Sequence, residues 1–210
     1  MADRSRSGEV LGTLKEIERC WEVNLCPCKK VKELRNINRE DLAELFFELR
    51  FERGAEIGVE RGEYSKLLAR NVCLKELLLV DAWTAYQGYR EHVSQDKLDG
   101  FMQQVIDQFA DNPAVKVIKN WSVAAAGDVP DKSLDFVYLD ANHTYEHVTA
   151  DIAAWAPKVR PSGIVSGHDY TRRKRMNYGV KEAVQEYAKK YKKDLIIIKG
   201  DRSPSWLWIA

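Results

Sequence analysis

The sequence predicts an α/β fold, in which a doubly wound and mostly parallel sheet of seven strands follows a set of added N-terminal helices. Short apolar runs of strand length alternate with helical patterns from residue 51 onward, as in parallel sheets that carry helices on both faces. Gly58 and Gly62 follow the first run, where a tight turn between strand and helix needs them. Asp81 ends the second run, about 20 residues downstream, where such a sheet can carry a ligand-binding acid.

The first fifty residues are expected to form a helical extension, and residues 51–210 are expected to form the core domain. Residues 10–23 are amphipathic, and residues 39–50 place Leu42, Leu45 and Phe46 at helical spacing. The second of these helices covers the site as a lid or packs in a homodimer, and its periodicity leaves both interpretations open.

The first half of the core domain is predicted to contain three strands and two helices. Residues 55–57 end a buried strand, and the apolar helical pattern of residues 64–69 follows the glycines. Residues 77–80 are apolar without interruption and predict the second strand. After a polar and aromatic loop, residues 97–109 place apolar side chains on one side of a helix, and residues 115–118 form the third strand.

The second half of the core domain repeats this alternation and ends on two strands. Pro157 stops its first helix, and Ser162 and Gly163 turn the chain into the next strand. Residues 195–198 are strongly β-branched, which favours a strand. The other elements are strands at 134–139, 164–166 and 206–209 and helices at 148–155 and 180–191.

This order of elements gathers polar side chains at one edge of the sheet. Ligands of doubly wound sheets bind at the carboxyl ends of the strands. Five residues occupy such positions, namely Glu56, Asp81, Asp140, His168 and Asp169. The sequence therefore places a binding site at that edge.

Composition sets bounds on the class of protein. The 210 residues are 45% hydrophobic and 31% charged, which is ordinary for one globular domain. The formal net charge of +1 gives no protein-wide basic surface for nucleic acid. Without an apolar run of transmembrane length or a signal peptide, we expect a cytoplasmic protein that does not contact membranes. The spacing of Cys20, Cys26 and Cys28 is irregular for zinc, so reduced thiols are expected.

The glycine loop indicates what kind of cofactor the edge binds. Dinucleotide sites need the pattern G-x-G-x-x-G, because bare backbone amides must hold a pyrophosphate. Here Val59, Glu60 and Arg61 separate single glycines, and Glu56 would repel a diphosphate. S-adenosylmethionine fits better, because it has a ribose, no phosphate, and cationic sulfonium and ammonium groups. The alternative is an ordinary strand, turn and helix with a surface acid.

Three blocks of sequence carry a resemblance to a known family. They are Ala55-Glu56-Ile57-Gly58-Val59-Glu60-Arg61-Gly62, the run Ser133 to Glu146 with Asp140-Ala141-Asn142-His143-Thr144-Tyr145-Glu146 at its end, and Gly167-His168-Asp169-Tyr170. Through them, residues 53–209 resemble a class I S-adenosylmethionine-dependent methyltransferase with a Rossmann-like sheet, and more narrowly the methyltransferase-24 family of small-molecule or sugar methyltransferases. One departure is Ser162, where relatives usually have a glycine.

The resemblance implies a cofactor role for individual residues. Glu56 and Gly58 would hold the amino acid part of S-adenosylmethionine, and Asp81 would hold its ribose. Trp83 would cover the adenine, with core packing as the alternative, and Ser122 would lie beside the ring. Gly62 and Asp140 complete the expected cofactor-binding set.

The chemistry is expected from a second cluster, which contains Asp140, His143, His168 and Asp169. Methyl transfer needs a positioned acceptor and a hydroxyl or amine made nucleophilic. The oxygen and nitrogen donors of this cluster could bind a divalent metal, magnesium or manganese, that lowers the pKa of an acceptor hydroxyl. A resemblance to metal-dependent catechol-type O-methyltransferases, which place acids after the same two strands, implies Asp140, His168 and Asp169 as its ligands. Without metal, His143 or His168 would be the general base, and Asp140 would complete the catalytic set. A purely structural role for these loops is the remaining alternative.

These observations predict a methyltransferase that acts on a hydroxyl of a small polar or sugar-like acceptor. The run Arg172-Arg173-Lys174-Arg175 follows the last motif and could attract an anionic acceptor, although such runs are commonly solvated loops. Two alternatives stay open. One is an iron-dependent hydroxylase-like enzyme that uses two histidines and a carboxylate, and the other is a non-catalytic nucleoside-binding module.

Overall fold

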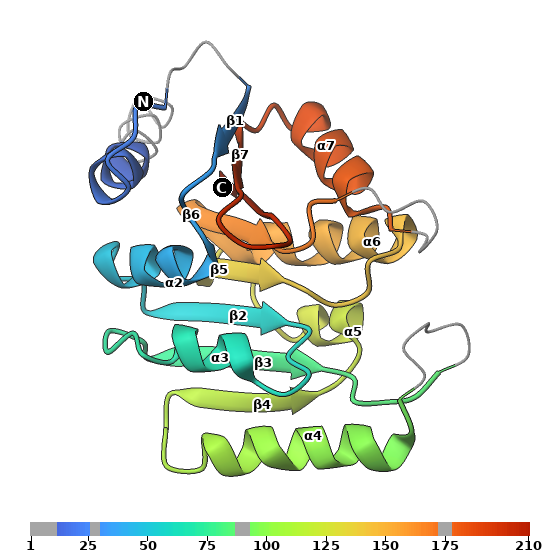
Figure 1. Ribbon diagram of the computed structural model, residues 1–210. Helices are drawn as coiled ribbons and strands as arrows, with labels where there is room; N and C mark the ends of the chain where they lie inside the picture. Colours follow the sequence, from blue (N-terminus) through green and yellow to red (C-terminus); the bar gives the residue numbers. More distant parts are fainter. Residues whose placement is uncertain (1–11, 26–29, 87–92, 172–177) are drawn as a thin grey trace.

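The computed structural model describes residues 12–25, 30–86, 93–171 and 178–210, and these residues build one eight-stranded sheet. Its strand order is β1-β7-β8-β6-β5-β2-β3-β4. All neighbouring strands are parallel except β8, which runs antiparallel to both β6 and β7. The predicted doubly wound, mostly parallel sheet is confirmed (Figure 1).

Each of the seven predicted strands is present. They are β2 (Arg53–Ile57), β3 (Glu76–Asp81), β4 (Val115–Lys119), β5 (Leu134–Leu139), β6 (Val159–Gly167), β7 (Leu195–Ile198) and β8 (Ser205–Ile209). The eighth strand, β1 (Val31–Leu34), was not predicted. It pairs in parallel with β7 and so extends the sheet at its edge. The N-terminal segment therefore contributes a strand as well as helices.

Helices cover both faces of the sheet. One face packs against α5 (Ser122–Gly127), α6 (Tyr145–Trp155) and α7 (Val180–Lys190). The other packs against a helix at residues 12–20 and against α2 (Arg39–Glu48), α3 (Glu63–Leu68) and α4 (Gln95–Gln108). A short 3-10 helix, η1 (Ala156–Lys158), follows α6. Helix α5 was not predicted, because its residues, apart from Val123, have small side chains that show no apolar period.

The N-terminal helices bury their apolar sides against the sheet. Leu42, Leu45 and Phe46 of α2 are buried, and the ring of Phe46 stacks on that of Phe136 with 4.2 Å between centroids. Thr13 donates a hydrogen bond of 2.9 Å to the carbonyl oxygen of Ser162. These contacts tie the first fifty residues to the core. Among the described residues, no helix is long and apolar enough to cross a membrane.

The strand order also fixes where a ligand can enter. Strand β2 lies between β3 and β5, and the chain proceeds outward from it in both directions. The carboxyl ends of β2, β3 and β5 lie on the same edge of the sheet (Figure 1). Such a topological switch point opens a crevice outside the strand ends.

Candidate active site

The turn after β2 depends on Gly58. Its backbone has φ = +89°, and a Cβ atom there would lie 2.2 Å from the carbonyl oxygen of Asp140. The backbone amide of Gly58 donates to the carbonyl of Val80, and that of Asp140 donates to the carbonyl of Ile57. A residue without a side chain is therefore required for β2, β3 and β5 to meet at this edge. Gly62, with φ = +76°, is the N-cap of α3.

Asp81 fixes the same turn from the end of β3. Its Oδ2 atom accepts hydrogen bonds from the backbone amides of Val59 and Glu60, each at 2.9 Å. Its Oδ1 atom accepts from the amide of Trp83 at 2.8 Å. Carboxylate oxygens offer about four acceptor sites in all, so the group keeps capacity for a ligand hydroxyl.

A cleft of about 870 Å³ lies at the switch point. It is lined by five of the residues predicted to bind the cofactor, namely Gly58, Asp81, Trp83, Ser122 and Asp140, and by His143 from the second cluster. Its volume is within the range of small-molecule sites. Trp83 is 1% exposed and donates from its indole nitrogen to the carbonyl of Glu60, so it forms a fixed wall. Trp121, at the rim, is 50% exposed.

Glu56 lies beneath the loop and is not among the residues that line the cleft. It is 2% exposed, and the hydroxyl of Ser65 on α3 donates a hydrogen bond to it. Burial raises the pKa of Glu56 to about 8, although the hydrogen bond from Ser65 opposes the shift. Its assignment to the amino acid part of the cofactor stays a prediction.

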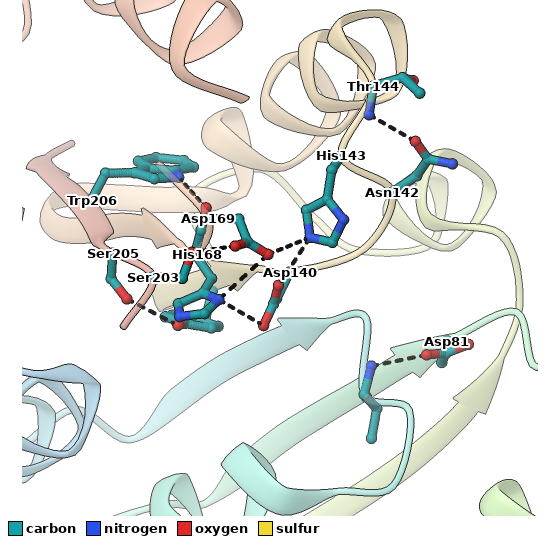
Figure 2. A network of polar contacts seen from close by, with 12 residues as sticks. Asp81, Asp140, Asn142, His143, Thr144, His168, Asp169, Ser203, Ser205 and Trp206 are labelled. Atoms are coloured by element: carbon teal, nitrogen blue, oxygen red, sulfur yellow. Dashed lines mark hydrogen bonds and ion pairs between the residues drawn. The ribbon is translucent and has the colours of Figure 1, made fainter. Parts of the chain in front are cut away.

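The second cluster comes together where the loops after β5 and β6 meet. Figure 2 shows Asp140, His143, His168 and Asp169 directed toward one another, with Asp81 apart at the end of β3. The Nε2 atom of His143 lies 2.8 Å from Asp169 Oδ2 and 3.4 Å from Asp140 Oδ1. The Nδ1 atom of His168 lies 3.6 Å from Asp140 Oδ2 and 3.7 Å from Asp169 Oδ2.

Contacts between imidazoles and carboxylates in this cluster shift the pKa values of three of its residues. Burial alone would lower the pKa of His143, but hydrogen bonds to Asp140 and Asp169 outweigh it and raise the pKa to about 9. His168 shows the same balance and also has a raised pKa. Burial of Asp169 is outweighed by hydrogen bonds from both histidines and Ser203, which hold its pKa well below the usual range. A His143 that carries its proton at neutral pH can donate it but cannot act as a base.

One set of side chains is spaced to bind a metal ion. The ligand atoms of Asp140, His143 and Asp169 all lie within 4.8 Å of one another. The sequence pointed instead to Asp140, His168 and Asp169, and because the Nδ1 atom of His168 lies within 3.7 Å of both carboxylates, that assignment stays a prediction. Two carboxylate oxygens and one imidazole form a donor set that manganese or magnesium accepts.

Sequence reasoning missed one buried acid in the cleft. Asp151 lies on α6, lines the cleft and is 6% exposed. The available signal was its position: Val148, Asp151, Ile152 and Trp155 share the buried side of the helix, and a charge there is unusual. Two other expectations, the basic run 172–175 and the pair Cys26 and Cys28, lie outside the described residues.

Comparison with known proteins identifies a matching family. A family model described as a methyltransferase domain matches residues 55–170, which is more than half of the chain. An uncharacterized protein of Sinorhizobium fredii is 26% identical over 127 residues. That alignment covers 58% of this chain and only 13% of the relative, so the chain spans a small part of that protein.

Solved structures share the fold at low sequence identity. A putative caffeoyl-CoA O-methyltransferase from Staphylococcus aureus gives a TM-score of 0.62 at 14% identity, covering 95% of this chain and 91% of that one. An O-methyltransferase from Bacillus cereus, solved in complex with S-adenosylhomocysteine, gives 0.60 at 14% identity, covering 97% and 91%. At this level of identity the likeness establishes the fold.

Proposed function

We propose, from the premise that this chain belongs to the class I S-adenosylmethionine-dependent methyltransferase family, that it transfers a methyl group to a hydroxyl of a small polar or sugar-like acceptor. One observation carries the proposal. Asp140 and His143 of the second cluster line the same cleft as Gly58 and Asp81 of the predicted cofactor site. Groups able to activate a hydroxyl therefore lie beside the place where the methyl donor would bind.

The cleft residues fit S-adenosylmethionine. Gly58 lines the cleft and lets the backbone of Asp140 approach the loop closely, Asp81 offers acceptor capacity for ribose hydroxyls, and Trp83 supplies an apolar wall. When bound, the cofactor supplies an electrophilic methyl group on a sulfonium. The chain orients it, and excludes the bulky phosphates of a dinucleotide because its loop has side chains at Val59 to Arg61.

The second cluster would prepare the acceptor. Asp140, His143 and Asp169 would hold a divalent cation, which lowers the pKa of a coordinated hydroxyl. With the cation in place, His143 would serve as a neutral ligand. The two carboxylates would balance the positive charge of the ion. We favour this route over a metal-free one, because without the ion both histidines lie against carboxylates that favour their protonated forms.

The chemistry of the acceptor remains part of the proposal. An anionic acceptor rests on the basic run 172–175. A homodimer and a lid formed by residues 1–50 rest on the sequence alone, and none of the described residues in that range lines the cleft. A cytoplasmic location is proposed as the default, and the balanced net charge gives no ground for proposing a nucleic acid partner.

Calorimetric titration of the metal-stripped protein with S-adenosylhomocysteine tests the cofactor site, with Asp81→Ala as the variant that should lose binding. Glu76→Ala, on the same strand and outside the cleft, is the matched control and should bind as the unmodified protein does. Failure of the unmodified protein to bind would contradict the proposal.

A second experiment separates the methyltransferase from its alternatives. Label from methyl-labelled S-adenosylmethionine should pass to hydroxylated acceptors, and addition of manganese should increase the rate. Iron-dependent oxygen consumption without methyl transfer would instead support a hydroxylase. Cofactor binding without turnover on any acceptor would support a non-catalytic module.

A further inference from the structure

A carboxyl group in the wall of the cleft has no part in the chemistry described above. Asp151 is 6% exposed, and its neighbours on the same side of α6, Val148, Ile152 and Trp155, are buried in the core. Burying a carboxylate costs free energy unless a partner compensates it. We therefore expect a hydrogen-bond donor to the Asp151 carboxylate within the protein. Because Asp151 lines the cleft, a bound ligand can supply a second donor.

The partner within the protein is Ser122, the first residue of α5. The indole nitrogen of Trp155 donates a hydrogen bond of 3.0 Å to Ser122 Oγ. An indole N–H can only donate, so Ser122 accepts there and keeps its own proton to donate. Burial raises the pKa of Asp151 to about 6, and a hydrogen bond from Ser122 opposes that rise. Trp155 and Ser122 thus orient a carboxylate that is mostly ionised at neutral pH.

The walls of the cleft contain both Asp151 and Asp81. Burial raises the pKa of the Tyr86 hydroxyl, which also lines the cleft, and the charges of both Asp81 and Asp151 raise it further. Asp81 lies at the end of β3, whereas Asp151 lies on α6, which packs beside α5 (Figure 1), and is hydrogen-bonded to Ser122 in the first turn of α5. A nucleoside whose ribose is held at Asp81 would extend its base toward α5 and α6.

We propose that Asp151 determines base specificity by accepting a hydrogen bond from the exocyclic amine of the adenine. This inference rests on the proposed cofactor site. An ionised carboxylate only accepts hydrogen bonds, and the amine at position 6 of adenine only donates them. A purine with an oxygen at position 6 would place an acceptor against the carboxylate. The site therefore selects a 6-amino purine over a 6-oxo purine.

The test compares S-adenosylhomocysteine with S-inosylhomocysteine, which differs by an oxygen at position 6, in calorimetric titrations. The unmodified protein should bind the adenosyl compound at least about tenfold more tightly, because a hydrogen bond to a charged group is lost in the other. Asp151→Asn should reduce this preference at least about tenfold, since an amide can donate to the 6-oxo group. Asp128→Asn, an exposed acid at the end of α5, should keep the preference of the unmodified protein.

The outcomes separate this inference from the proposed function. If the unmodified protein binds neither compound, the proposed cofactor site is wrong. If it binds both equally, or if Asp151→Asn keeps the original preference, the cofactor site stands and the role of Asp151 is overturned. If Asp151→Asn does not fold, as judged by circular dichroism, the preference of the unmodified protein decides, together with N6,N6-dimethyl-S-adenosylhomocysteine, which lacks the donor and should bind as poorly as the inosyl compound.

Discussion

The Nε2 atom of His143 lies 2.8 Å from the Oδ2 atom of Asp169, a contact that joins the loop after β5 to the loop after β6. Asp169 reaches this position with φ = +52°, and Ser203 donates a hydrogen bond to its other carboxylate oxygen. The imidazole therefore sits where Asp140 and Asp169 converge. A cation at this site would have to replace the proton shared between His143 and the carboxylates.

Asp169→Asn is expected to weaken manganese binding at least about tenfold, because it removes one of two charged ligands of the proposed site. Calorimetric titration of the metal-stripped protein with manganese measures the effect. Asp131→Asn provides the control, since that exposed acid pairs with Lys158 away from the cluster. Equal affinity of Asp169→Asn and the unmodified protein would place the metal elsewhere.

Gly58→Ala should destabilise the protein and abolish binding of S-adenosylhomocysteine. The added Cβ would lie 2.2 Å from the carbonyl oxygen of Asp140, and the positive φ would cost about 1–2 kcal/mol by itself. Gly100→Ala is the matched change, because no atom lies within 4 Å of its Cβ position in α4. That variant should raise the free energy of unfolding by about 0.5–1 kcal/mol. Urea denaturation of both would test this, and equal stability of the two variants would refute the steric argument.

The sheet could be predicted because its strands bury their side chains. Residues 77–80 and 195–198 are uninterrupted apolar runs, and both are strands. Strand β1 could not be predicted from the sequence, because only Lys32 of its four residues is buried and two of the four are charged. Its conformation comes from pairing with β7, which lies more than 160 residues further along the chain. Edge strands of this kind carry no pattern of their own.

The candidate site could be predicted in part for a similar reason. The sequence places Asp81, Asp140 and His168 at strand ends, and topology alone gathers them at one edge. Which imidazole lies closer to the two carboxylates depends on the conformation of two loops, including the positive φ of Asp169, and no local pattern encodes it. Asp151 could be recognised in the sequence as a charged residue among apolar ones on the same side of a helix. The orientation of its carboxylate, however, depends on a hydrogen bond from Ser122, which lies on another helix.

Glu56 should make the stability of the protein depend on pH. Burial raises its pKa from 4.5 to about 8, so the folded state holds a proton that the unfolded state has lost between these values. This contribution to stability is complete below pH 4.5 and is lost as the pH rises through about 8. Glu56→Gln should flatten this fall in the free energy of unfolding.

Urea denaturation at several pH values would measure the effect of Glu56. The difference between the unmodified protein and Glu56→Gln isolates this group from the histidines, which also have raised pKa values. Glu63→Gln, an exposed acid paired with Lys66, should leave the pH dependence unchanged. Parallel curves for the unmodified protein and Glu56→Gln would show that Glu56 ionises in the folded state as it does in water.

Ser162→Gly should stabilise the protein. Ser162 has φ = +68° and is 4% exposed, and its hydroxyl has no hydrogen-bond partner among the described residues. Relief of the left-handed backbone should contribute about 1–2 kcal/mol, and removal of a buried, unsatisfied hydroxyl should add about 1 kcal/mol or more. Against this stands the greater freedom of glycine in the unfolded chain, about 0.5–1 kcal/mol. The favourable terms are larger, so a net gain of about 1–2.5 kcal/mol is expected in urea denaturation.

The control Ser133→Gly should instead lower the free energy of unfolding, because Ser133 lacks a positive φ and donates a hydrogen bond to the carbonyl of Pro130. Loss of stability in Ser162→Gly would mean that the serine hydroxyl contributes a contact that outweighs its backbone strain.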